Sequence, residues 1–186
     1  YEIPTHFFKY HLGSKLKYSS CENSDDCNSI DTLEIHTLNN YQKYLKLYEL
    51  KEGNILETGC GWGSLSIYNA IKYPNLKFVC FSNSKTQIEY INSIIKKNDI
   101  KNLKAIVEDY NIFCGNNSKI KGSFDRVVSI ETIEHCRNIE TIFKAIHNRL
   151  KDDGFYFIQS LVKQNTSYIM TNDSWMGRHF FFRWSN

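Results

Sequence analysis

Two carboxylates and an imidazole lie close together in the segment Ser-Ile-Glu-Thr-Ile-Glu-His at positions 129–135. Glu131, Glu134 and His135 occupy positions i, i+3 and i+4, so they project from one face if Glu131 opens a helical turn. Converging carboxylates hold a neighbouring histidine charged or ready to accept a proton, which suits general-base catalysis near neutral pH. The alternative is a solvated helix start, where the helix dipole favours acids. We call these three residues the acid–histidine group.

A glycine-rich segment is the second place where the sequence could do chemistry. Residues 54–63 form an apolar run that ends in a carboxylate and continues through Gly59, Gly61 and Gly63. Because glycine has no Cβ and reaches positive φ, such a turn can close tightly and let a nucleoside-bearing cofactor lie against its amides. A dinucleotide-binding fingerprint would need glycine at position 64, where this chain has Ser64. GxGxG after an acid-tipped strand instead resembles motif I of S-adenosylmethionine (SAM) methyltransferases; the alternative is an ordinary glycine-rich turn.

The elements that must position these residues follow a strand–helix alternation. Apolar segments rich in β-formers are separated by helical ones, which indicates a parallel sheet covered on both faces. The predicted strands are 54–57, 77–82, 104–109, 124–130 and 155–161. Ligands of such sheets bind at the carboxyl ends of the strands. The glycine segment and the acid–histidine group follow the first and fourth strands, and this placement favours the catalytic interpretation.

Helix signals agree with this division. Asp31 with Glu34, and Ser84 with Gln87, have the spacing of a capping box. Apolar stripes at helical period predict core faces rather than cofactor contacts. The stripes are Leu33, Leu38, Tyr41, Leu45 and Tyr48, then Ile88, Ile91 and Ile95, then Ile139, Ile142, Phe143, Ile146 and Leu150. A turn at Asp153-Gly154 is expected before the fifth strand.

Composition narrows the class of protein. The length of 186 residues predicts one domain, and the net charge of +3 comes from 23 basic and 20 acidic residues too mixed for a nucleic-acid-binding stripe. The six cysteines lack metal-type CxxC spacing and indicate reduced thiols in a cytoplasmic protein. No apolar stretch of about 18 residues and no signal peptide are seen, which leaves only peripheral contact with a membrane. The sequence does not set the oligomeric state.

Several separated segments resemble one family in the same order. The chain resembles the cyclopropane-fatty-acid-synthase superfamily of SAM methyltransferases, especially its coclaurine N-methyltransferase-like branch. The matching segments are 1–8, 12–13, 16–19, 59–65, 83–87, 129–131 with 134–135, and 175–176 with Arg178 and 180–181. The resemblance therefore extends from Tyr1 to about Phe181.

The resemblance implies a class I SAM-methyltransferase fold, an α/β Rossmann-like doubly wound sheet with an N-terminal helical cap. The family sheet has seven strands in the order 3-2-1-4-5-7-6, and this chain accounts for 3-2-1-4-5, with the C-terminal β-hairpin strands apparently missing. We expect a single domain, 1–186, with a cap and helix over 1–52, a Rossmann-like core over 53–162 and the start of a substrate lid over 163–186. Either the chain is a fragment or residues are omitted near position 183.

The resemblance also implies a cofactor site for SAM, whose product is S-adenosylhomocysteine (SAH). Tyr18 and Ser19 would close over the methionine end of SAM, with the tyrosine ring near the sulfonium. The glycine loop would supply backbone contact, mainly from Gly59 and Gly61. Amides would replace the ribose-binding acid that this chain lacks. The full set of expected cofactor-binding residues is Tyr18, Ser19, Gly59, Cys60, Gly61, Gly63, Ser82, Asn83, Gln87, Asp109, Tyr110 and Ile130. Asp109 and Tyr110 would flank the adenine; the alternatives are a turn-forming acid and a packed rim aromatic.

The implied reaction is methyl transfer to the nitrogen of a small amine. His135 with Glu134 would remove the amine proton, Glu131 would hold the amine cation, and Trp175 would stack on the acceptor or pack beneath a lid helix. Within the superfamily the alternative acceptor is a lipid double bond, which gives a cyclopropane ring through a carbocation deprotonated by bicarbonate. Ser20, Gln159 and Glu131 depart from that pattern, and the amine is favoured. Gln159 departs from the N-methyltransferase branch as well, so it distinguishes neither acceptor. Two further alternatives are a non-catalytic SAM-binding domain and an NAD-binding oxidoreductase.

Overall fold

A parallel sheet forms the centre of the protein. The computed structural model describes residues 5–162, and its five strands are ordered β3-β2-β1-β4-β5, all parallel. The strands are β1 (Gly53–Thr58), β2 (Leu76–Ser82), β3 (Leu103–Val107), β4 (Phe124–Ile130) and β5 (Leu150–Gln159). This order confirms the predicted doubly wound fold class. The predicted lid over 163–186 lies outside the described residues.

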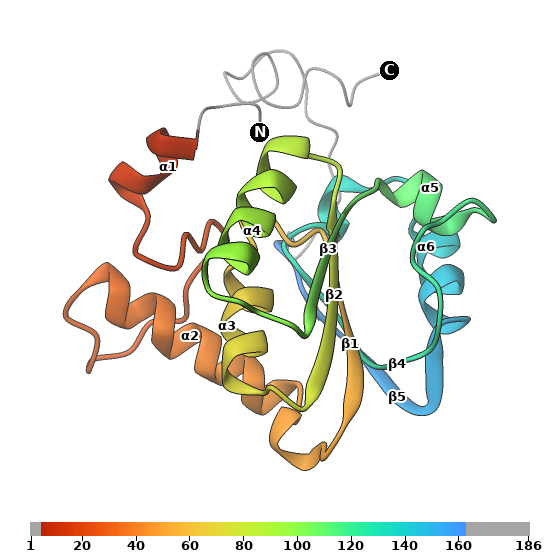
Figure 1. Cartoon of the computed structure of the whole chain (residues 1–186), viewed down its shortest axis with the longest axis horizontal. Coiled ribbons are helices and arrows are strands. Elements are labelled where there is room, and N and C mark those ends of the chain that lie inside the picture. The colour runs from red at the N-terminus through yellow and green to blue at the C-terminus, as the bar shows by residue number, and fades with distance from the viewer. Residues whose placement is uncertain (1–4, 163–186) are drawn as a thin grey trace.

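Helices cover both faces of the sheet. They are α1 (Thr5–His11), α2 (Ile30–Tyr44), α3 (Ser64–Lys72), α4 (Lys85–Lys97), α5 (Tyr110–Cys114) and α6 (Ile139–His147), with 3₁₀ turns η1 (Leu47–Glu49) and η2 (Ile133–His135). Figure 1 shows α2, α3 and α4 on one side of the sheet and α5 and α6 on the other, with α1 at the outer edge beside α4. Within residues 5–162, no helix has the length and apolar character needed to cross a bilayer.

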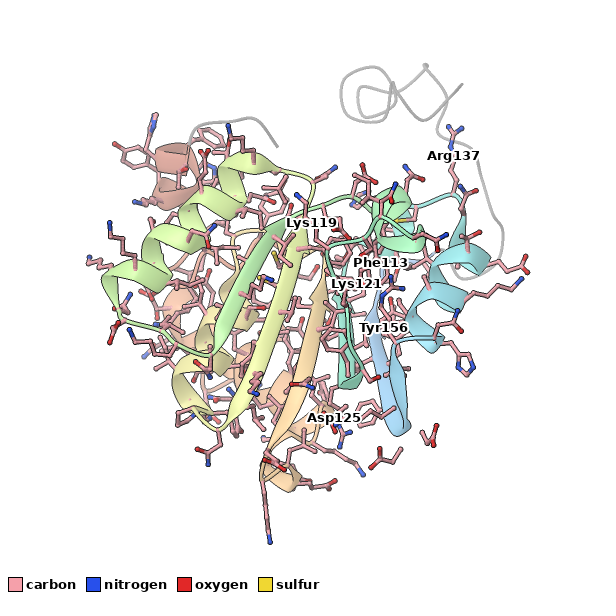
Figure 2. All side chains as sticks on the ribbon, turned by 45° about the vertical axis from the view of Figure 1, so that its right-hand side comes forward. Phe113, Lys119, Lys121, Asp125, Arg137 and Tyr156 are labelled. Carbon is pink, nitrogen blue, oxygen red and sulfur yellow. The ribbon has the colours of Figure 1, made fainter. Side chains whose placement is uncertain are left out.

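Two apolar clusters fill the two layers, because neighbouring residues of a strand point to opposite faces. In β1, Ile55 packs with residues of α2, α3 and α4, whereas Leu56 packs with residues of α5 and α6. Tyr156 of β5 and Phe113 of α5 lie in this second layer, and Asp125 lies at the opposite end of the sheet from Arg137 (Figure 2). Because helices cover both faces, the strand ends are the edges at which polar groups can gather.

The end of β3 differs from the prediction. The strand ends at Val107 rather than at Asp109. The next carboxylate, Glu108, accepts hydrogen bonds from Ser118 Oγ at 2.6 Å and from Lys119 N at 2.8 Å, so it belongs to the following loop. Asp109 therefore lies beyond the sheet.

The start of β5 also differs from the prediction. The strand begins at Leu150 and runs through Asp153-Gly154, where a turn was expected. A shift in its register with β4 between Phe124 and Arg126 accommodates the extra residues. The dipeptide is thus absorbed as a strand irregularity rather than a reversal of the chain.

The predicted cap of α2 is wrong by two residues. Ser29 is the N-cap: its Oγ accepts from Thr32 N at 3.2 Å, and Thr32 Oγ1 accepts from Ser29 N at 3.1 Å. Asp31 and Glu34 instead accept hydrogen bonds from the N-terminal segment. These acids hold a distant part of the chain rather than their own helix end.

The cap of α4 is confirmed in part. Ser84 Oγ accepts from Gln87 N at 3.4 Å, as the capping-box spacing predicts. The Gln87 side chain does not return to the cap, because its Oε1 accepts from Ser82 Oγ at 2.8 Å. The apolar stripe predicted along α2 stops before Tyr48, which lies in η1 with 66% of its surface exposed.

Candidate active site

The glycine loop and the acid–histidine group meet at the switch point of the sheet. β1 and β4 are neighbours, and Thr58 is paired with Ser129 immediately before both motifs. Gly59 has a φ of +69°, and a Cβ placed there would lie 2.0 Å from Cγ2 of Thr132. Only glycine fits this position, because the segment that carries the acids packs directly on the loop.

Gly61 and Gly63 have different roles. A Cβ on Gly63 would lie 2.7 Å from Cγ1 of Ile91, so this glycine allows α4 to approach. Gly61 has a φ of +52°, and among the described residues, 5–162, no atom lies within 4 Å of its Cβ position, so its backbone is open there. The amide of Cys60 already donates to the carbonyl oxygen of Phe81 at 2.9 Å. Gly61 is therefore the position in the loop where a ligand could approach bare peptide.

Glu131 does not open a helical turn, as the sequence had suggested. It has a left-handed φ of 48°, and the short turn η2 begins two residues later. Its carboxylate accepts from Ser20 N at 3.1 and 3.2 Å and from Gln159 Nε2 at 3.0 Å, and its own N–H donates to Gln159 O at 2.8 Å. The N-terminal segment and β5 thus meet at this carboxylate.

Glu134 is held separately at the end of β5. Its carboxylate accepts from Ser160 Oγ at 3.1 Å and from Leu161 N at 3.2 Å. The two acids therefore belong to one strand-end cluster but have different partners. This separation allows them to have different roles.

His135 closes η2 next to Glu134 and is half-buried. Burial lowers the pKa of His135 from its ordinary value of 6.5, against the opposing effect of the Glu134 and Glu131 charges. The sequence had left open a charged histidine or one ready to accept a proton. Since desolvation is the largest effect, the neutral imidazole is favoured near neutral pH.

Residues 13–20 form a strap that is fastened to α2. The buried Glu34 carboxylate accepts from Gly13 N at 3.0 Å, Lys15 N at 2.8 Å and Lys17 N at 3.0 Å. Asp31 accepts from Ser14 N at 2.5 Å. Two acids of α2 therefore fix the backbone of the strap, which continues to Glu131 through Ser20.

Lys17 organises the end of the strap. Its buried ammonium donates to Ser19 O at 3.1 Å, Ser19 Oγ at 2.7 Å and Ser20 O at 2.5 Å, and lies 5.2 Å from the centre of the Tyr41 ring. Burial lowers the pKa of Lys17, while nearby acids, Glu131 among them, raise it. Because the Lys17 ammonium binds these carbonyl oxygens, the backbone N–H of Ser20 points toward Glu131.

Tyr18 and the glycine loop are joined by aromatic packing. The Tyr18 ring is 51% exposed and meets the Phe8 ring edge-on at 5.5 Å, and Phe8 lies 5.0 Å from Trp62. Trp62 follows Gly61 and is buried, yet its indole N–H has no acceptor among residues 5–162. Buried donors are normally paired, so the indole N–H of Trp62 is an unsatisfied donor on the residue that follows the open backbone of Gly61.

The predicted cofactor residues at the end of β2 are close to one another. Ser82 and Gln87 are buried and hydrogen-bonded to each other, whereas Asn83 is exposed. Ile130, at the end of β4, is buried in the core cluster of the α2, α3 and α4 layer. Trp175 lies outside the described residues.

The predicted residues at the end of β3 have structural partners. Asp109 is the N-cap of α5, and its Oδ1 accepts from Asn111 N at 2.7 Å and Ile112 N at 3.0 Å, so the turn-forming alternative applies. Both bonds use the same oxygen, which leaves Oδ2 for another donor. The Tyr110 ring meets Phe81 edge-on at 5.3 Å, and burial raises the pKa of its hydroxyl.

Four residues of the site were missed by the sequence interpretation or assigned another role. Lys17 was quoted only within the matching segment 16–19 and given no role, Glu34 was taken as a helix cap, and Tyr41 was taken as core alone. Gln159 was seen only as a departure from the family pattern. Lys17 directly precedes the Tyr-Ser segment, and this position was the one feature of the sequence that could have indicated its role. The contacts of Glu34, Tyr41 and Gln159 join residues far apart in the chain.

Comparison with known proteins identifies relatives of the whole chain. Residues 1–183 match the family model of mycolic acid cyclopropane synthetase. (S)-coclaurine N-methyltransferase of Thalictrum flavum subsp. glaucum is 29% identical over 185 residues, which cover 97% of this chain and 49% of that relative. N-methyltransferase 4 of Papaver somniferum is 36% identical over 163 residues, which cover 87% of this chain and 44% of the relative.

A solved structure agrees with these matches. Coclaurine N-methyltransferase bound to N-methylheliamine and SAH superposes with a TM-score of 0.76 at 29% identity, over 84% of this chain and 44% of that one. The chain spans about half the length of the curated relatives it matches. Because the family model covers almost every residue, and the observed strand order is the expected one, the chain belongs to the mycolic acid cyclopropane synthetase family.

Proposed function

We propose that this chain carries the cofactor site and the acceptor-binding acids of a SAM-dependent methyltransferase that methylates the nitrogen of a small amine. The observation that carries the proposal is the environment of Glu131. Its carboxylate lies at the switch point beside the glycine loop, and the donors that hold it, Ser20 N and Gln159 Nε2, are uncharged. An anion held by neutral donors keeps its charge available for a cationic acceptor.

The loop and strap present groups that suit the chemistry of this cofactor. Gly61 offers open peptide, and the next residue, Trp62, carries an unsatisfied indole N–H. Tyr18 and Ser19 would hold the methionine end, where the exposed Tyr18 ring suits a sulfonium cation. SAM supplies a methyl group on a positively charged sulfur, which a lone pair can attack.

The nucleoside would extend along the ends of β2 and β3. Asn83 and Gln87 would contact the ribose hydroxyls, since an amide can both donate and accept. Asp109 Oδ2 and the Tyr110 ring would contact the adenine. In this proposal Asp109 keeps its expected contact with the cofactor and also caps α5.

The acceptor amine must lose a proton before its nitrogen can attack. Glu131 would bind the ammonium form by a charge-assisted hydrogen bond. His135, whose pKa burial lowers, would take the proton and release the nitrogen lone pair, and the Glu134 carboxylate would stabilise the resulting imidazolium. Positioning and a water-poor strand-end site supply the rest of the rate enhancement.

The names of the relatives support nitrogen as the acceptor. (S)-coclaurine N-methyltransferase and N-methyltransferase 4 are both named as N-methyltransferases. The family model is named for a lipid-modifying activity, so a lipid double bond is the competing acceptor. Glu131 favours the amine, because its charge can bind the ammonium form of the acceptor before reaction, whereas a neutral alkene gains no such attraction on binding.

The test is incubation of the purified protein with methyl-labelled SAM, a mixed amine pool and phospholipid vesicles, followed by mass spectrometry. Label in amines, with SAH formed in equal amount, is expected. Glu131→Gln should raise the KM for the amine, whereas His135→Gln should mainly lower kcat; Glu140→Gln, on the exposed face of α6, is the matched control. Label confined to phospholipid acyl chains would refute N-methylation, and unchanged kinetics in both site variants would refute the assigned roles.

A further inference from the structure

We propose that Tyr41 is a positioning residue that acts through Gln159 to fix the orientation of the Glu131 carboxylate. The role of Glu131 in holding an amine rests on the proposed function, whereas the contacts do not. Tyr41 OH donates to Gln159 Oε1 at 2.8 Å, and Gln159 Nε2 donates to Glu131 Oε1 at 3.0 Å. A tyrosine of α2 is thereby linked to an acid at the end of β4 through a side chain of β5.

The direction of this chain of hydrogen bonds follows from the chemistry of its ends. An ionised carboxylate only accepts hydrogen bonds, so Gln159 must present its NH₂ to Glu131. The amide oxygen then faces Tyr41, whose hydroxyl must be the donor. In the opposite orientation the amide oxygen would face the carboxylate and repel it. The Glu131 carboxylate therefore sets which end of the amide faces it, and the Tyr41 hydroxyl, by donating to the amide oxygen, holds the Gln159 side chain in that orientation.

Tyr41 is well suited to hold a fixed position. Its side chain is 1% exposed, and its ring packs against Phe157 at 6.1 Å and beneath the Lys17 ammonium at 5.2 Å. Removing the hydroxyl alone leaves both ring contacts in place. The hydrogen bond to Gln159 can thus be deleted with little other change in the core.

The chain itself supplies a matched control. Tyr44 lies three residues after Tyr41 on α2, and its ring stacks on the same Phe157 at a centroid distance of 5.5 Å. Its hydroxyl donates to Glu22 Oε2 at 3.1 Å rather than to Gln159. Tyr44→Phe therefore removes a hydroxyl from the same helix and the same aromatic cluster, and it leaves the hydrogen bonds of Gln159 and Glu131 in place.

Two measurements test the inference. In ¹⁵N NMR spectra, the side-chain amide of Gln159 should exchange its hydrogens faster, by about tenfold, in Tyr41→Phe than in the wild type, and should not change in Tyr44→Phe. In steady-state assays, Tyr41→Phe should raise the KM for the amine about fivefold or more, with the Kd for SAH within about twofold of the wild type. A change confined to KM separates positioning from a general loss of structure.

A double variant supplies the decisive comparison. If Tyr41 acts only through Gln159, then adding Tyr41→Phe to Gln159→Met should cause no further rise in KM. An unchanged Gln159 amide signal in Tyr41→Phe, or multiplicative effects of the two substitutions, would overturn the inference. If the wild type methylates no amine, the proposed function fails while the NMR comparison still decides whether Tyr41 orients Gln159.

Discussion

Alanine substitution at two glycines of the same loop should separate packing from ligand binding. At Gly59, a Cβ would lie 2.0 Å from Thr132 Cγ2, at a φ of +69°. Thr132 cannot easily rotate away, because its Oγ1 lies 3.0 Å from Ser129 Oγ and donates to Thr58 O at 3.2 Å. At Gly61 the φ is +52°, and the Cβ position is open.

The expected magnitudes differ accordingly. A non-glycine residue in the left-handed region costs about 1–2 kcal/mol, and overpacking adds about 1–3 kcal/mol. The smaller entropy of the unfolded alanine chain offsets about 0.4–1 kcal/mol in both variants. Gly59→Ala should therefore lose about 1–4.6 kcal/mol of unfolding free energy and Gly61→Ala about 0–1.6 kcal/mol, with the difference of about 1–3 kcal/mol due to overpacking. In the proposed site Gly61 offers its backbone to the cofactor, so its variant should instead bind SAH at least about tenfold more weakly.

Urea denaturation measures the first quantity, and calorimetric titration with SAH measures the second. Thr132→Ser removes Cγ2 and keeps the hydroxyl, so it should restore part of the stability lost in Gly59→Ala. Equal stability of Gly59→Ala and the wild type would refute the packing argument. Wild-type SAH affinity in Gly61→Ala would refute the assignment of the open peptide to the cofactor.

Three further predictions concern buried acids and the histidine. Burial raises the pKa of Glu57 from 4.5 to about 7, so the folded state loses stability progressively as the pH rises from 4.5 to 7, and the loss is complete above that range. Glu57→Gln should therefore raise the unfolding free energy by a few kcal/mol at pH 8 and change it little at pH 4, as measured by urea denaturation. Glu34→Gln should weaken the attachment of the strap to α2, because an amide cannot accept from three backbone N–H groups as a carboxylate does. Limited proteolysis of this variant should cut the chain near residues 13–20, whereas Glu49→Gln, on an exposed turn, should leave that segment protected. The acidic limb of log kcat/KM against pH should fall below 6.5, since burial lowers the pKa of His135 in the free protein, and a limb at or above 6.5 would contradict the neutral imidazole.

The sequence predicted the arrangement of strands because its signals there are local. Apolar segments alternate with helical stripes, and the glycine loop and the acid–histidine group were placed correctly at the ends of β1 and β4. The family was likewise confirmed, since the matching segments are spread over the whole chain.

The errors arose where a residue has partners far away in the sequence. Asp31 and Glu34 have capping-box spacing, but Ser29 caps the helix and both acids bind the strap, 17 to 21 residues earlier. Glu131 was assigned to a helical turn, yet its backbone has a left-handed conformation and its N–H donates a hydrogen bond to the carbonyl oxygen of Gln159. No local pattern reports a contact of this kind. Trp175 lies outside the described residues, so its assignment stays a prediction.

The way in which Glu34 holds the strap has a consequence for sequence divergence. The carboxylate binds three main-chain amides, so the fastening does not depend on which side chains stand at positions 14 and 15. Gly13 is the exception, because a Cβ there would lie 2.6 Å from Glu34 Oε2. Related chains can therefore alter the outward surface of this segment freely, while the pair of Gly13 and Glu34 must be inherited together.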